Sequence, residues 1–337
     1  MKLYAGIDLH SNNSVVVVID EARNEQFRRK VPNDINYITE ILSPYKAMLQ
    51  GIVVESTYNW YWLVDGLMEA DFKVHLANTA AIQQYSGLKY TDDNSDAHWL
   101  AELLRLNILP EGYIYPKEQR VIRDLMRKRM QLVQQRTLNI LSIQGLYARH
   151  LNRSLKGDKI KKLTTEQIGL DFEMHVSLAV KSNLAVINCV EEQIDILEKT
   201  LKRAVCLTPA FTQLTSIDGI GLILALTIML ETGEINRFKT VGDYASYCRC
   251  IGGAKYSNGK KKGRSNSKNG NKFLSWAFTE AAHYGIRYNT TIKKYYQRKL
   301  AKTNKIIAIK TVAHKLSRAC FYVLRDNVPF EVEKAFM

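Results

Sequence analysis

Short hydrophobic segments with strand character dominate the start of the chain. Two runs rich in strand-forming residues, at 2–10 and 13–20, are separated by turn-prone residues, and residues 25–31 alternate well enough for a third strand. Such runs predict three consecutive strands. A helical spacing of apolar residues follows at 33–49, with Asn33 or Asp34 as its cap.

Strands and helices then alternate as far as residue 106. Buried strands are expected at 51–56 and 72–78, and helices at 58–70 and 93–106. Three successive strands followed by alternating helices and strands form the element order of an RNase H-like (RuvC-like) fold. We therefore expect an α/β domain at residues 1–115.

The middle of the chain has a different period. A basic amphipathic pattern predicts one long helix at 119–151, and a polar loop follows it. A second apolar seam has coiled-coil spacing over about two heptads: Ile187, Val190, Ile194, Leu197 and Leu201. The seam serves either a helical pair within one chain or a dimer. We assign residues 116–205 to a helical, coiled-coil segment.

A third, mostly helical domain is expected at residues 206–330. Within it, Gly219, Ile220 and Gly221 stand between two apolar runs. This spacing resembles a helix-hairpin-helix, whose turn offers backbone N–H groups to a phosphate. A plain turn between two helices fits the pattern equally well. The expected fold class is thus α/β plus α.

Charge is divided unequally along the chain. The 337 residues carry 48 Lys and Arg against 33 Asp and Glu, a net charge of +15. Residues 1–115 hold 9 basic and 15 acidic side chains, so the remainder holds 39 and 18 and carries +21. A surplus of this size predicts a polyanionic partner such as nucleic acid.

Several other classes of protein are disfavoured. Five cysteines without a CxxC pair indicate neither a disulfide framework nor a zinc site. The start of the chain does not have the pattern of a signal peptide, and no apolar run approaches the ~18 residues of a membrane span. We expect a soluble, cytoplasmic protein.

Four carboxylates are candidates for one metal site. Asp8 interrupts the apolar run of the first strand, where an unpaired charge is costly, and Glu55 ends the fourth strand. Parallel pairing of these strands would set Asp8 beside Glu55, while Asp93 and Asp96 share one face at a helix start. Such a cluster suits Mg²⁺, which can clamp a phosphate. Taken singly, each acid also fits a turn, a solvated strand end or a helix cap, and Asp92 rivals Asp93.

The stretch 255–272 contains seven basic residues and no acid. It is either a solvated linker or a loop that binds a phosphate backbone. In the second case, Ser257 supplies a reactive hydroxyl, with Ser265 and Ser267 as alternatives. The expected phosphate contacts are those of its cationic side chains: Lys260, Lys261, Lys262, Arg264 and Lys268.

The chain resembles the DEDD transposases of the insertion-sequence one-hundred-and-ten family, relatives of the Piv DNA invertases. The resemblance spans nearly the whole chain. It consists of motifs in the same order: GIDLH at 6–10, VVES at 53–56, DNSDA at 93–97, IDGIGLILA at 217–225, and SNGKKKGR at 257–264 followed by GN at 270–271.

This resemblance implies a RuvC-like domain, a coiled coil and a transposase domain that carries a serine. It assigns Mg²⁺ binding to Asp8, Glu55, Asp93 and Asp96, and attack on DNA through a covalent phosphoserine link to Ser257. It also implies double-stranded donor and target DNA, a structured noncoding bridge RNA as guide, and a homo-oligomer, either dimer or tetramer.

The chain departs from the family pattern at three places. The family often has two adjacent serines where this chain has Ser257 and Asn258. Residues 251–254 replace a usual Gly-Leu-x-Pro, and Tyr90 replaces a usual Lys. No reactive group is lost by these changes.

Other functions compete with recombination. A RuvC-like nuclease would hydrolyse DNA with water and form no adduct, and a non-catalytic RNA-binding protein would leave the placed acids without a purpose. A sugar kinase or chaperone-type ATPase also opens with GIDL. It needs a Gly-Thr phosphate loop next, however, where this chain has His10-Ser11-Asn12-Asn13.

Overall fold

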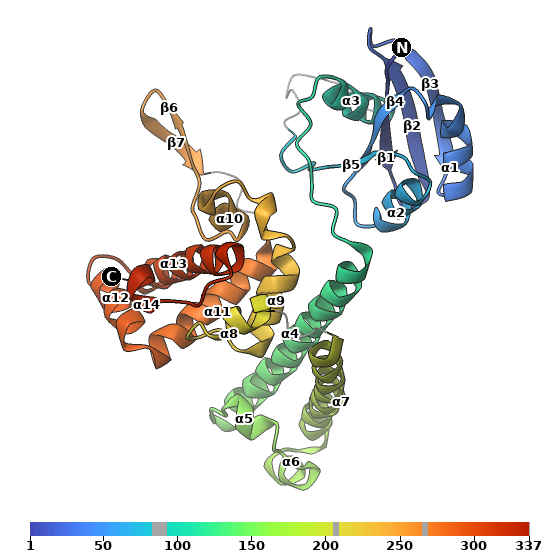
Figure 1. Cartoon of the computed structure of the whole chain (residues 1–337). Coiled ribbons are helices and arrows are strands. Elements are labelled where there is room, and N and C mark those ends of the chain that lie inside the picture. Colours follow the sequence, from blue (N-terminus) through green and yellow to red (C-terminus); the bar gives the residue numbers. More distant parts are fainter. Residues whose placement is uncertain (83–92, 205–208, 265–268, 337) are drawn as a thin grey trace. The chain divides into compact units, whose positions relative to one another are not determined.

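The computed structural model describes residues 1–82, 93–204, 209–264 and 269–336, which divide into two compact units, Met1–Lys117 and Glu118–Met337 (Figure 1). The predicted middle and C-terminal domains both fall in the second unit, so the division between residues 205 and 206 stays a prediction. No helix in these described ranges has the length and apolar character needed to cross a membrane.

A mixed five-stranded sheet forms the centre of the first unit. Its strands lie in the order β3-β2-β1-β4-β5: β1 (Leu3–Leu9), β2 (Asn13–Asp20), β3 (Glu25–Pro32), β4 (Leu49–Glu55) and β5 (Val74–Ala77). The first three strands form an antiparallel meander, and β4 runs parallel to both β1 and β5. The predicted parallel pairing of the first and fourth strands is confirmed, with Ile7 opposite Val54.

Helices cover both faces of this sheet. Leu3, Ala5 and Ile7 pack with α1 (Ile35–Leu42) and α2 (Tyr61–Glu69) on one face, and α3 (Asp93–Arg105) packs on the other. The Asp34 side chain caps α1, which ends earlier than expected because the 3₁₀ turn η1 (Ser43–Tyr45) contains a proline.

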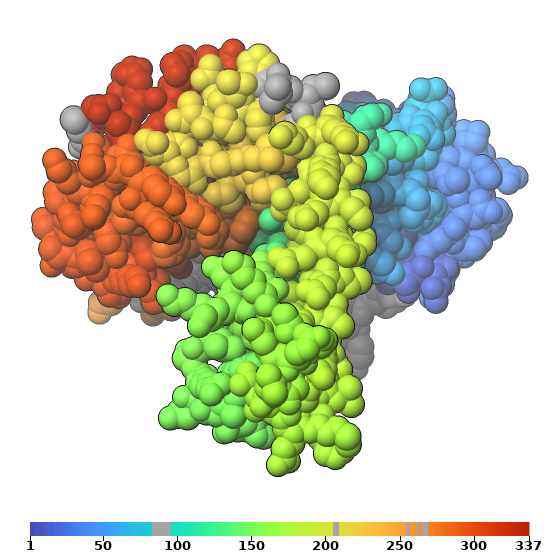
Figure 2. Space-filling model, turned by 90° about the horizontal axis from the view of Figure 1, so that it is seen from below, coloured from blue at the N-terminus to red at the C-terminus, as the bar shows by residue number. Residues whose placement is uncertain are grey.

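Two long helices pair at the start of the second unit (Figure 1). They are α4 (Lys117–Leu151) and α7 (Met174–Ala204), joined through α5 (Gly157–Ile160) and α6 (Thr165–Asp171). Ile187 of the predicted seam is fully buried in a cluster with Ile143 and Tyr147 of α4. At Ile187 the seam therefore packs against α4 within one chain. In Figure 2 the end of this pair that carries α5 and α6, in light green, faces the viewer.

The rest of the second unit is a helical bundle with a projecting β-hairpin. Its elements are α8 (Pro209–Thr215), α9 (Leu222–Thr232), η2 (Ile235–Arg237), α10 (Val241–Tyr247), β6 (Ala254–Ser257), β7 (Lys260–Arg264), α11 (Lys272–Tyr288), α12 (Thr290–Leu300), α13 (Lys305–Asp326) and α14 (Val332–Phe336). Large aromatic side chains fill its core, among them Tyr244, Phe278 and Phe321, and Met126 of α4 packs into the same core.

Candidate active site

A glycine lets α3 lie directly on the backbone of β1. A Cβ atom placed on Gly6 would stand 2.0 Å from the carbonyl oxygen of Ala97 and 2.8 Å from the backbone nitrogen of Ala101. Any side chain at residue 6 would therefore push the helix away. Because side chains alternate across a strand, Asp8 lies on the same face as Gly6, under α3. Asp96 is the neighbour of Ala97 on that helix.

Three of the four predicted acids meet at this point. The Asp8 side chain is 4% exposed, and the register that pairs Ile7 with Val54 brings Asp8 beside Glu55. Burial raises the pKa of Glu55 to about 8, and a hydrogen bond with Asp8 and the charges of Asp8 and Asp96 add to this shift. Close carboxylates of this kind hold a proton unless a cation takes its place.

The fourth acid is only partly placed. Asp93 is the first residue of α3, one turn before Asp96, but its side chain and all of Asp92 lie outside the described residues. The choice between these two acids therefore stays open. Among the residues whose side chains are described, no three His, Cys, Asp or Glu side chains form a ready metal site. The chemistry of the donors still suits a hard divalent cation, because all of them are carboxylates.

His10 is a site residue that the sequence analysis did not assign. Its Nε2 lies 3.3 Å from Oδ2 of Asp8, and its carbonyl oxygen accepts hydrogen bonds from the side-chain amides of Asn33 and Asn59. These two amides fix the turn after β1. The signal in the sequence was a histidine two residues beyond a buried acid, which places both on one face of the strand.

Trp99 is a second residue that the sequence analysis missed. It lines a cavity of about 260 Å³ together with Glu55, Asp96 and Thr79. Its indole nitrogen is buried and has no hydrogen-bond partner among the described residues. A donor of this kind near the carboxylates can bind an oxygen of a substrate. The sequence did contain a signal for it: Trp99 follows Asp96 by three residues in a predicted helix, which places both side chains on one helix face.

Ser257 lies in a hairpin, where the sequence suggested a loop. It ends β6 and pairs with Lys260, the first residue of β7. Asn258 and Gly259 form the turn with φ values of 50° and 70°, as a two-residue type I′ turn requires. Ser257 is exposed at the tip of this hairpin, where its hydroxyl is accessible to a large substrate.

Two cationic side chains of the hairpin are described. Lys260 and Lys262 are exposed on β7. The side chains of Lys261 and Arg264 lie outside the described part, as do residues 265–268 with Ser265, Ser267 and Lys268. The predicted phosphate contacts and the two alternative serines therefore stay predictions.

Gly219 and Gly221, the predicted phosphate contacts of the bundle, differ in their surroundings. Gly219 has a φ of +98°, and a Cβ there would stand 2.5 Å from the carbonyl oxygen of Ala281 on α11. This glycine is thus required for packing. Gly221 is the N-cap of α9, and no atom lies within 4 Å of its Cβ position, so its backbone is open to a ligand.

A buried network holds the base of the hairpin segment. Glu231 of α9 is 1% exposed and accepts two hydrogen bonds from Arg127 of α4, at 2.6 and 2.7 Å. The side-chain nitrogen of Asn271 donates to the same carboxylate at 2.7 Å, and its oxygen caps α11. Arg127, Glu231 and Asn271 therefore tie α4 to the point where the chain returns from the hairpin.

Two regions of the chain match known protein families. Residues 5–150 match a family model described as "Transposase", that of the DEDD transposases of the IS110 type, and residues 212–297 match one described as "Transposase IS116/IS110/IS902 family". A curated relative from Streptomyces coelicolor, "Insertion element IS110 uncharacterized 43.6 kDa protein", is 25% identical over 158 residues. That match covers 46% of this chain and 39% of the relative. The chain belongs to the IS110 family of transposases.

Proposed function

We propose that this chain is a Mg²⁺-dependent DNA recombinase of an insertion sequence that forms a covalent phosphoserine intermediate. The observation that carries the proposal is the meeting of Asp8, Glu55 and Asp96 under α3, in a chain whose two matched regions hold these acids and Ser257. The strand order supports an RNase H-like interpretation of residues 1–115.

The chain's own residues divide the reaction between them. Asp8, Glu55, Asp93 and Asp96 would hold Mg²⁺, which supplies positive charge to the scissile phosphate and the attacking oxygen. Ser257 loses its hydroxyl proton as its oxygen bonds to phosphorus, and the departing strand leaves with a free hydroxyl. The hydroxyl of a second strand then attacks the phosphoserine and releases the serine. Because no phosphodiester is lost to water, strands are exchanged.

Two parts of the proposal concern partners. The surplus of +21 after residue 115 supports binding of both double-stranded DNA and a structured bridge RNA. Lys260, Lys262 and Gly221 are proposed contacts for phosphates. For this reaction, Ser257 and the carboxylates around Asp8 must act on the same phosphodiester. They can do so within one chain or between copies of a homo-oligomer.

The decisive experiment is recovery of a protein–DNA adduct. Purified protein is mixed with guide RNA, labelled donor and target DNA and Mg²⁺, and denatured. We expect a labelled species that resists SDS and yields a peptide with phosphate on Ser257. Ser257→Ala should lose adduct and product and keep nucleic-acid binding, whereas Ser265→Ala and Ser267→Ala should react normally. Cleavage without any adduct would indicate a nuclease that uses water.

A further inference from the structure

The last helices of the chain carry an unusual concentration of positive charge. From residue 281 to residue 325 the sequence contains eleven Lys and Arg and no Asp or Glu. This run covers α12 and most of α13 and is separate from the hairpin of Ser257. Charged residues in a helix can be dispersed over its solvent-exposed surface without forming a site. Their positions in the structure decide between dispersal and a site.

Part of this charge converges on one place. The side chains of Arg298, Lys299 and Lys315 all lie within 6 Å of the Tyr295 ring, at 5.8, 5.5 and 5.8 Å from its centroid. Three cations around one ring create a positive potential that favours an anion nearby. Lys315 and Arg318 have no acidic partner among the described residues, and both charges add to burial in lowering the pKa of His314.

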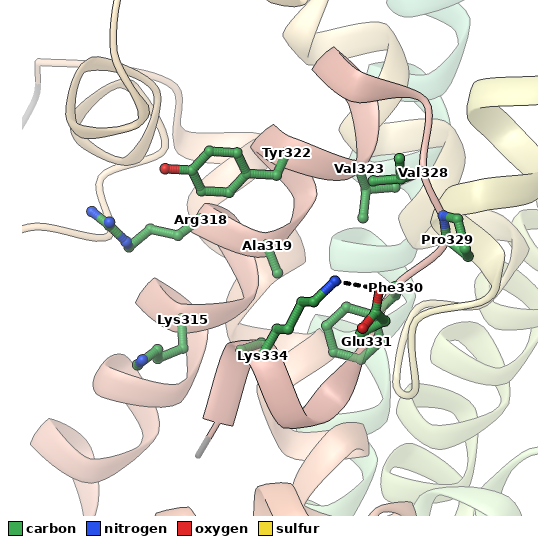
Figure 3. Close-up of a pocket in the computed structure, with 11 residues that line it drawn as sticks. Lys315, Arg318, Ala319, Tyr322, Val323, Val328, Pro329, Phe330, Glu331 and Lys334 are labelled. Carbon is green, nitrogen blue, oxygen red and sulfur yellow. Dashed lines mark hydrogen bonds and ion pairs between the residues drawn. The ribbon is translucent and has the colours of Figure 1, made fainter.

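A cavity opens beside these cations. It has a volume of about 280 Å³ and lies between α13 and the segment that leads into α14 (Figure 3). Tyr322, Ala319 and Val323 line it from α13, and Val328, Pro329 and Phe330 line it from the opposite segment. The rest of its lining consists of three cations, one acid and one alanine: Lys315, Arg318, Lys334, Glu331 and Ala335. Glu331 pairs with Lys334 at 2.7 Å, which leaves the cations of α13 available.

The chemistry of this cavity fits one nucleotide. Its volume lies just below the ~300–1,000 Å³ of typical ligand pockets, which suits a single ring system. The exposed ring of Tyr322 and the aliphatic wall can contact a base, while Lys315 and Arg318 can hold its phosphate. A base stacked inside a duplex cannot enter, because its faces are already covered.

We propose that this cavity binds one unpaired nucleotide of the nucleic acid partner, with its base against Tyr322 and its phosphate at Lys315 and Arg318. The inference rests on the proposed function, which requires a nucleic acid partner. It adds a site for unpaired bases, which occur in loops of structured RNA and in DNA strands opened during exchange.

Binding of labelled oligonucleotides to the full chain tests the proposal. The probes are one sequence as single-stranded DNA, single-stranded RNA and duplex DNA, at fixed salt. Tyr322→Ala removes the stacking surface, and Ala319→Phe fills the cavity without changing charge. Each should weaken single-strand binding by about five- to hundredfold and duplex binding less than about twofold, given that one stacked base contributes about 1–3 kcal/mol. Comparison of the affinities for single-stranded DNA and single-stranded RNA shows which of the two the site binds.

Charge variants complete the test. Lys315→Gln with Arg318→Gln should weaken single-strand binding about tenfold more than Lys302→Gln with Lys305→Gln, which removes equal charge from exposed positions outside the cavity. If wild-type protein binds single strands and all cavity variants bind them equally well, the site is refuted and the proposed function stands. If wild-type protein binds no nucleic acid, the proposed function itself fails. Thermal unfolding checks that each variant is folded.

Discussion

Gly6 and Ala97 are in contact through their backbones, and this contact organises the candidate active site. The carbonyl oxygen of Ala97 occupies the place where a side chain on residue 6 would begin, 2.0 Å from the ideal Cβ position. The contact lowers α3 onto β1, so that Asp96 and the buried Asp8 both act on Glu55. The position of a helix, and with it the carboxylate cluster, thus depends on the absence of one methyl group.

Gly6→Ala should separate these two elements. We expect it to destabilise the first unit by about 1–3 kcal/mol, as overpacking does, and to abolish DNA cleavage because Asp96 moves away from Glu55. Thermal unfolding and cleavage assays measure the two effects. Gly112→Ala is a matched control, since its nearest contact would be 3.4 Å, an ordinary distance. Full activity of Gly6→Ala would show that α3 can shift without harm to the site.

The raised pKa of Glu55 predicts how stability depends on pH in the presence of a chelator. Its pKa rises from 4.5 to about 8 in the folded protein, so the folded state binds more protons than the unfolded state between these values. Stability should therefore fall as the pH rises from about 4.5 to 8. The melting temperature across this range measures the effect, and Glu55→Gln should flatten it.

Mg²⁺ should counteract this loss of stability at high pH. A cation and a proton compete for the same oxygens, so added Mg²⁺ should raise the melting temperature more at pH 8 than at pH 5. Asp8→Asn should reduce this gain. An equal rise at both pH values, or an equal rise in Asp8→Asn, would mean that Mg²⁺ binds elsewhere.

Much of the first unit followed from the sequence because its signals are local. Alternation and β-branched runs located the strands, and the antiparallel meander followed by parallel strands placed Asp8 beside Glu55. The close approach of α3 was not predictable, since Gly6 also fits a flexible strand. His10 escaped notice for a related reason. Its role depends on a turn held by Asn33 and Asn59, which are distant in sequence.

In the second unit, tertiary contacts decided what the sequence left open. The seam of Ile187 was compatible with a pair or a dimer, and in the structure Ile187 packs in one cluster with Tyr147 of the same chain. Ser257 was expected in a loop because the basic run contains no apolar alternation. Asn258 and Gly259 are nevertheless a strong hairpin signal, which the surrounding lysines and glycines obscured.

The buried Arg127–Glu231 pair should be sensitive to loss of one partner. Arg127→Met leaves the carboxylate of Glu231, which is 1% exposed, without its guanidinium partner. The free energy of unfolding should fall by about 3–5 kcal/mol, less a reduction for solvent screening because Arg127 is partly exposed. Adding Glu231→Gln should recover much of the loss. Denaturant unfolding of both single variants and the double variant gives the coupling energy. Arg325→Met, at an exposed pair with Asp326, is the control and should cost under about 1 kcal/mol.

The turn of the hairpin should matter for the chemistry of Ser257 and little for binding. Gly259 has a φ of +70° and no atom within 4 Å of its Cβ position, so Gly259→Ala strains only the backbone, by about 1–2 kcal/mol. The strain should distort the turn and misplace the serine hydroxyl, which lowers the rate of adduct formation about tenfold. DNA affinity should stay within about twofold, because Lys260 and Lys262 keep their charge. Asn258→Gly is the matched control, since glycine adopts the left-handed conformation freely and should react at the wild-type rate. If Gly259→Ala forms adduct as fast as the wild type, the hairpin tip is not the part of the chain that positions the nucleophile. If it loses adduct and DNA binding together, the hairpin acts in binding alone.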